Sequence, residues 1–232
     1  MDLFQSLQGG LVVSCQPEVD DPDHDPLNRP EFMAALAQAA VRGGALGIRA
    51  DSPAHIAAIR AAVGVPIIGL YKKDLPGYAV RITPTAVLAA ELAAAGADIL
   101  ALDATDRSRP EGGSPAGYIQ AVLRATGKPV LADISTFAEA LAAADAGAAA
   151  VATTLSGYTP YSRQAEEGPD YGLLERLARA LSIPIIAEGR FNTPDQAARA
   201  LACGAWAVTV GSAITRPKTI TAWFVKAMHA PK

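Results

Sequence analysis

The chain has 232 residues, of which 50% are hydrophobic and 19% are charged, and its formal net charge is −3. This composition supplies a large apolar core and excludes an intrinsically disordered protein, while the length suits a single domain over residues 1–232. The weakly acidic balance excludes a broad basic surface for nucleic acid, and no apolar run reaches the ~20 residues that a membrane-spanning helix needs.

Eight short apolar runs, each closed by polar residues, recur along the chain. They cover residues 11–16, 45–50, 66–72, 99–105, 129–135, 149–155, 184–190 and 207–212. Runs that are apolar at successive positions are typical of strands buried on both faces of a parallel sheet. A stretch with helical periodicity follows each run. The pattern therefore predicts an α/β fold, a single-domain (β/α)8 TIM barrel, whose active site lies at the carboxyl ends of the strands.

Most of the expected helices begin at a hydroxyl-bearing residue or a proline and end at a glycine. They run from Pro30 to Gly43, from Asp51-Ser52-Pro53 to Gly64, from Thr83-Pro84 to Gly96, from Ser114 to Gly127, from Thr136 to Gly147 and from Thr193-Pro194 to Gly204. A capping hydroxyl accepts an N–H of the first turn, proline presets that turn, and glycine supplies the left-handed residue that ends the helix.

Polar residues at the ends of the eight runs are expected to converge on one cleft. They are Gln16, Arg49, Lys72, Asp103, Asp133, Thr153 and Glu188. Lys72 and Glu188 are the candidate acid–base pair, because burial at a strand end lowers the pKa of a lysine toward the range of a useful base. Lys73 must point the other way. A structural ion pair at the barrel mouth is the alternative for both residues.

Glycines and arginines after the last two runs predict a phosphate site. The seventh run is followed by Gly189-Arg190 and the eighth by Gly211-Ser212, with Arg216 shortly after. Phosphate sites in such barrels commonly lie between these two loops, where glycine lets backbone N–H groups approach an anion. The alternative is that Gly211 is a turn glycine and Arg216 a surface residue.

Other reactive residue types do not form a site in the sequence. The histidines, His24, His55 and His229, do not end a run, so no metal site is expected. Cys15 faces away from the cleft if Gln16 faces into it. Together with Cys203, and with no signal peptide visible, Cys15 suggests free thiols in a reducing, cytoplasmic location. The polar segments 17–29 and 156–170 either fold over a ligand or are solvated loops.

An ordered set of short motifs resembles one known enzyme family. The motifs are GGLVVSCQ, GIRADS, IIGLYKKD, ITPT, LALDATDRSRP, ADIST, TTLSGYT, IIAEGR and GSAITRP, and they span about residues 7–224. In this order they resemble N-acylglucosamine-6-phosphate 2-epimerase, also called N-acetylmannosamine-6-phosphate 2-epimerase. The resemblance implies a barrel that interconverts N-acetylmannosamine 6-phosphate and N-acetylglucosamine 6-phosphate in sialic acid or aminosugar breakdown, without metal or organic cofactor, and commonly as a homodimer.

The resemblance also assigns roles to individual residues. It implies that Lys72 and Glu188 are catalytic, and the substrate-binding positions are Gln16, Arg49, Asp133, Arg216, Gly189-Arg190 and Gly211-Ser212. One departure is that segment 17–29 is longer and more acidic than the family pattern leads us to expect. Two other functions stay open on the residues alone: a Schiff-base aldolase that uses Lys72, and a non-catalytic sugar-phosphate sensor.

Overall fold

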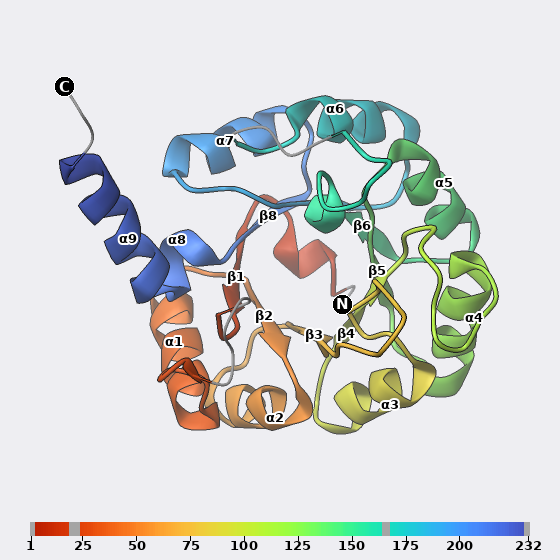
Figure 1. Ribbon diagram of the computed structural model, residues 1–232, viewed down its shortest axis with the longest axis horizontal. Coiled ribbons are helices and arrows are strands. Elements are labelled where there is room, and N and C mark those ends of the chain that lie inside the picture. The colour runs from red at the N-terminus through yellow and green to blue at the C-terminus, as the bar shows by residue number, and fades with distance from the viewer. Residues whose placement is uncertain (1–2, 19–23, 164–167, 230–232) are drawn as a thin grey trace.

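Eight parallel strands close into a barrel in the order in which they occur along the chain, with β1 hydrogen-bonded to β8 (Figure 1). The computed structural model describes residues 3–18, 24–163 and 168–229. The strands are β1 (Leu11–Cys15), β2 (Gly47–Asp51), β3 (Ile67–Leu70), β4 (Ile99–Asp103), β5 (Val130–Asp133), β6 (Ala150–Ala152), β7 (Ile185–Glu188) and β8 (Ala207–Val210). The predicted (β/α)8 barrel is confirmed.

Helices form an outer ring around the strands. They are α1 (Pro30–Arg42), α2 (Pro53–Ala62), α3 (Ala86–Ala94), α4 (Pro115–Thr126), α5 (Phe137–Asp145), α6 (Tyr171–Ala180), α7 (Pro194–Ala202), α8 (Ser212–Thr215) and α9 (Pro217–Met228). The described residues also include the short 3₁₀ helices η1 (Gln5–Leu7) and η3 (Thr153–Leu155). Figure 1 shows that α9 leaves the ring and projects from the barrel. None of the helices in the described ranges is long and apolar enough to cross a bilayer.

Two helix boundaries differ from the sequence expectation. Helix α3 is capped by Thr85, whose side chain accepts from the Leu88 N–H at 3.3 Å, and not by Thr83. The Thr83 hydroxyl instead donates to the Ala101 carbonyl at 2.8 Å, and Pro84 disfavours a helical conformation at Thr83. Helix α2 ends at Ala62 with extended backbone at the next residue, so Gly64 does not terminate it.

Two apolar layers surround the strands. The outer core packs strands against helices and includes Cys15, which therefore faces away from the barrel interior as expected. The inner core fills the barrel with side chains such as Val12, Ile68 and Ile186. Leu7 of η1 is fully buried in this inner cluster, so the N-terminal turn closes the amino end of the barrel. The carboxyl ends of the strands form the opposite, open mouth.

Candidate active site

Strand alternation turns the apolar interior into a polar mouth. In β3 the inward-facing Ile68 and Leu70 belong to the inner core, and Lys72 is the next residue in the same register. In β7 the inward-facing Ile186 is followed two residues later by Glu188. Because successive side chains of a strand point to opposite faces, these polar residues lie one layer above the apolar core. The barrel thus directs charged side chains to its open end.

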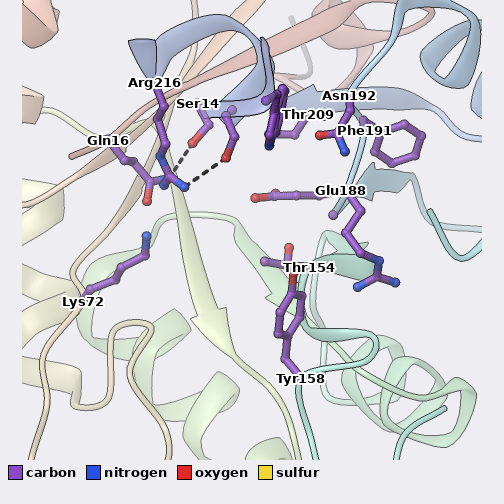
Figure 2. A pocket seen from close by; sticks show the side chains of 15 residues that line it. Ser14, Gln16, Lys72, Thr154, Tyr158, Glu188, Phe191, Asn192, Thr209 and Arg216 are labelled. Carbon is purple, nitrogen blue, oxygen red and sulfur yellow. Dashed lines mark hydrogen bonds between the residues drawn. The ribbon is translucent and has the colours of Figure 1, made fainter. Parts of the chain in front are cut away.

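A cavity of about 350 Å³ occupies this mouth. Its walls come from the ends of β1, β3, β6, β7 and β8 and from the loops and helices that follow them. The polar and aromatic side chains that line it and are labelled in Figure 2 are Ser14, Gln16, Lys72, Thr154, Tyr158, Glu188, Phe191, Asn192, Thr209 and Arg216. The cavity is therefore shaped for a polar ligand with apolar parts.

Lys72 and Glu188 enter the cavity from opposite walls. Strands β3 and β7 are four positions apart in a closed ring of eight, and Figure 2 shows the two side chains pointing into the cavity from its two sides. Burial, aided by the cations Arg216 and Arg49, lowers the pKa of Lys72 to about 8, although Asp51 and Glu188 act in the opposite direction. The Lys72 ammonium forms no ion pair with any residue in the described ranges. Lys72 is therefore suited to accept a proton near neutral pH.

The Glu188 carboxylate is held from below by a buried arginine. Arg49 is 1% exposed and donates to both carboxylate oxygens of Asp133, at 3.1 and 2.6 Å. Its Nη1 also lies 3.2 Å from Glu188 Oε2. Burial raises the pKa of Glu188, an effect that Arg49 partly offsets. Glu188 therefore combines a fixed position with a pKa closer to neutrality.

Arg49 and Asp133 are not among the residues that line the cavity, but they contact residues that do. Asp133 is fully buried and accepts from the Thr154 hydroxyl at 2.7 Å in addition to Arg49. Arg49 and Asp133 thus contact two residues that line the cavity, Glu188 and Thr154, and their direct contact with substrate stays a prediction. Sequence reasoning identified the residues but could not identify their partners.

The wall formed by β7, β8 and α8 brings together the residues expected to bind phosphate. Arg216 Nη1 donates to Ser212 Oγ at 3.1 Å, and Arg216 Nη2 donates to the Pro17 carbonyl at 3.4 Å. Gly189 has a φ of 112°, which favours glycine, and a Cβ at Gly211 would lie 3.2 Å from the Cβ of Ser14. Both glycines and Arg216 line the same cavity.

Several buried polar atoms of the cavity have no hydrogen-bond partner among the described residues. They are Gln16 Oε1, Thr209 Oγ1 and Arg216 Nε, and Glu188 Oε2 has only its ion pair with Arg49. Buried polar atoms in native proteins are nearly always satisfied. Their presence on the walls of this cavity is consistent with a site that completes its hydrogen bonds with a polar ligand.

Arg190 is placed differently from the expectation. Its guanidinium donates to the carbonyls of Gly168 at 2.6 Å and Ser156 at 2.8 Å, and it lies over the Tyr158 ring at 5.5 Å. The side chain therefore attaches the loop after β6 to the barrel while Arg190 still lines the cavity. Parts of both long polar segments, residues 19–23 and 164–167, including most of the acidic run, lie outside the described residues.

The structure adds residues that the sequence analysis missed. Thr154, and not the expected Thr153, lines the cavity; Thr153 is buried and donates its hydroxyl to the Glu188 carbonyl at 2.8 Å. Counting every second residue from Ala150 would have selected Thr154, and the same count from Ala207 gives Thr209. Tyr158, Asn192 and Trp223 lie beyond the strands, where alternation gives no signal.

The remaining candidates lie outside this constellation. Asp103 is paired with Arg107 at 2.6 Å. Burial raises the pKa of Cys15 to about 12, which makes its thiol a poor nucleophile. Within the described ranges, no three His, Cys, Asp or Glu side chains are arranged to hold a metal ion.

Comparison with known proteins gives a consistent result. A profile of the family described as "Putative N-acetylmannosamine-6-phosphate epimerase" matches residues 33–230. Two relatives named "Putative N-acetylmannosamine-6-phosphate 2-epimerase" come from Thermosynechococcus vestitus and Escherichia coli O157:H7. The first is 49% identical over 99% of this chain and 98% of its own length, and the second is 48% identical over 98% and 95%.

Solved structures agree with the sequence comparison. The N-acetylmannosamine-6-phosphate 2-epimerase from Clostridium perfringens superposes with a TM-score of 0.91 at 40% identity, covering 98% of this chain and 96% of that one. A thiamine phosphate pyrophosphorylase from Pyrococcus furiosus, 17% identical with a TM-score of 0.61 over 94% of this chain and 92% of its own, shares the fold alone.

Proposed function

The chain belongs to the N-acetylmannosamine-6-phosphate epimerase family, and we propose that it interconverts N-acetylmannosamine 6-phosphate and N-acetylglucosamine 6-phosphate by removing and returning the proton at C2. The observation that carries this proposal is the placement of Lys72 and Glu188 on opposite walls of one cavity. Sialic acid or aminosugar breakdown is the pathway in which this reaction belongs.

Removal of the C2 proton requires a base and an acidified carbon. In the open-chain sugar, C2 lies next to the C1 aldehyde, so loss of its proton gives an enolate. Neutral Lys72 takes this proton, and its pKa of about 8 leaves a useful fraction of the amine unprotonated near neutral pH. Glu188 is the second proton-transfer group on the other wall, for ring opening or for return of the proton to C2.

The phosphate is proposed to bind at the wall of β7, β8 and α8. Arg216 supplies a guanidinium, Ser212 a hydroxyl, and the backbone near Gly189 and Gly211 supplies N–H groups. Binding energy from this remote group holds C2 beside Lys72 without taking part in the proton transfer. Gln16 and Thr209 provide polar atoms for the hydroxyls of the sugar chain.

We test the proposal by proton NMR of the protein with N-acetylmannosamine 6-phosphate in D2O. We expect N-acetylglucosamine 6-phosphate to form with deuterium at C2. K72A should lose both conversion and C2–H exchange, whereas the matched variant K73A should keep them, because Lys73 is exposed and stacks on Tyr71 with its Nζ 4.4 Å from the ring centre. Absence of turnover and exchange in folded protein would overturn the proposal.

The lowered pKa of Lys72 also suits a Schiff base, so the aldolase is the second candidate. Borohydride reduction in the presence of substrate separates the two functions. A covalent sugar adduct on Lys72 favours the aldolase, and an unmodified lysine together with C2 exchange favours the epimerase.

We further propose that the protein acts as a homodimer in the cytoplasm. None of the residues of α9 is buried, and its exposed large apolar side chains include Trp223, Phe224 and Met228. Such a helix is costly to leave in water, and a second copy of the chain would cover it. F224E should shift the sedimentation coefficient to that of a monomer, whereas a variant that sediments like the parent protein would argue against this interface.

The proposed cytoplasmic location is supported by the cysteines. Cys15 and Cys203 form no disulfide, which suits a reducing compartment.

A further inference from the structure

A second cavity, of about 460 Å³, adjoins the first one at Lys72, Thr154 and Tyr158. Its other walls come from the segment that follows β3, from the end of β4 and from η3. These walls consist of Ala79, Arg81, Ile82, Asp103, Arg107 and Leu155. Nothing in the proposed proton transfer or phosphate binding uses these residues.

The position of the second cavity is fixed by the barrel. Strand β4 is four positions from β8 in the closed ring of eight, so the two cavities extend to opposite sides of the mouth. The proposed phosphate wall belongs to β7 and β8, and Lys72 lies between that wall and the second cavity. A sugar held by its 6-phosphate, with C2 at Lys72, must therefore direct a substituent of C1 or C2 toward β4.

The chemical character of the cavity selects between these substituents. Ala79, Ile82 and Leu155 supply apolar surface. Arg107 donates Nε to Thr105 Oγ1 at 2.9 Å and Nη2 to Asp103 Oδ2 at 2.6 Å, and no residue in the described ranges accepts from its Nη1. These apolar side chains, beside the N–H groups of Arg107 Nη1, match an acyl chain with its amide oxygen better than the polar C1 end of the sugar.

The size of the cavity exceeds what an acetyl group fills. A volume of about 460 Å³ lies in the range of roughly 300–1,000 Å³ that accommodates whole small ligands. Ala79, on the segment after β3, is exposed and carries only a methyl group. The cavity is therefore open on that side, where a longer acyl chain could extend.

We propose that this second cavity binds the N-acyl group of the substrate, that it admits linear acyl groups longer than acetyl, and that the small side chain of Ala79 leaves room for them. The proposal rests on the proposed epimerase function and specifies its substrate class. Arg107 orients the amide oxygen, and the added methylenes lie against Ile82 and Leu155.

The test compares N-acetyl-, N-propanoyl- and N-butanoylmannosamine 6-phosphate by NMR in D2O. We expect kcat/KM for the longer substrates to be no lower than for the acetyl substrate. Each methylene that becomes buried should raise it by up to about fourfold. A79L should lower the ratio of kcat/KM for the butanoyl substrate to that for the acetyl substrate at least tenfold. A90L, a matched change at an exposed position of α3, should leave this ratio unaltered.

The outcomes separate this proposal from the function on which it rests. Turnover of the acetyl substrate with a hundredfold loss for the propanoyl substrate would overturn the acyl site and leave the epimerase standing. Turnover of the longer substrates with an unchanged ratio in A79L would overturn the assignment of this cavity. If the folded protein does not act on the acetyl substrate, both proposals fall together.

Discussion

Replacement of Arg49 by methionine tests the most deeply buried charge of the site. Arg49 is 1% exposed and joins three strands, because it pairs with Asp133 at the end of β5 and with Glu188 at the end of β7. Methionine keeps much of the aliphatic bulk and removes the guanidinium. Two buried carboxylates then face each other without a cation, so the substitution isolates the electrostatic contribution of Arg49.

The magnitude follows from the burial of both partners. Asp133 is fully buried and Glu188 is 14% exposed, so water cannot replace the lost hydrogen bonds. Breaking a buried pair by removal of one partner costs about 3–5 kcal/mol. We therefore expect R49M to lose about that much of its free energy of unfolding, a large part of the ~5–15 kcal/mol that stabilises an ordinary domain.

The loss should also depend on pH. Without the guanidinium, burial and the Asp133 carboxylate raise the pKa of Glu188 further above its ordinary value of 4.5. A carboxyl with a raised pKa in the folded state binds its proton more tightly there than in the unfolded chain, so stability falls as pH rises above that ordinary value. The deficit of R49M should consequently be smaller near pH 5 than at about pH 8.

Urea denaturation at several pH values measures this prediction, with the double variant R49M/D133N as the control. The asparagine removes one of the two carboxylates but still accepts from Thr154, so the double variant should be more stable than R49M alone. Parent-like stability of R49M at about pH 8, or a deficit that is the same at every pH, would refute the assignment of Arg49 as the counter-ion.

The remaining predictions concern the cavity. Because Lys72 must be neutral to accept a proton, kcat/KM should rise with pH to a plateau, with a midpoint at about 8, and a flat profile across that range would contradict a base with this pKa. R216M should raise KM for N-acetylmannosamine 6-phosphate with little change in kcat, because it removes binding to the remote phosphate; an unchanged KM would remove Arg216 from the phosphate site. R190L removes two charged hydrogen bonds to loop carbonyls, and thermal unfolding should show a loss of at least about 1.5 kcal/mol, whereas an unchanged melting temperature would mean that Arg190 does not fasten the loop.

Strand alternation explains how much of this site could be predicted from sequence. Once Lys72 is assigned to the interior, the same register places Leu70 and Ile68 below it, as the structure has them. In β6 the register counted from Ala150 and Ala152 directs Thr154 into the cavity, whereas the expected Thr153 has the opposite orientation. The error could have been avoided with the sequence alone.

The partners of the charged residues could not be predicted in this way. Arg49, Asp133 and Glu188 come from β2, β5 and β7, which are not adjacent in the barrel. Their contact depends on the length of the arginine side chain and on the width of the barrel at that layer, neither of which appears in a local pattern. For the same reason the sequence context of Arg190, which resembles a phosphate loop, gives no sign of the hydrogen bonds that its guanidinium donates to the carbonyls of Gly168 and Ser156.

Charge pairing in the mouth separates supporting groups from groups that are free to react. Asp133 accepts from Arg49 and Thr154 and is fully buried, so it has little capacity left for a substrate. Glu188 shares Arg49 with Asp133, because its Oε2 lies 3.2 Å from Arg49 Nη1 in an ion pair that lacks hydrogen-bond geometry. Lys72 has no ion-pair partner in the described ranges, and burial lowers its pKa. Lys72 is thus a charge of the mouth that has no ion-pair partner among the described residues, and it faces a carboxylate whose cation, Arg49, is shared with Asp133; the proposed proton transfer uses this arrangement.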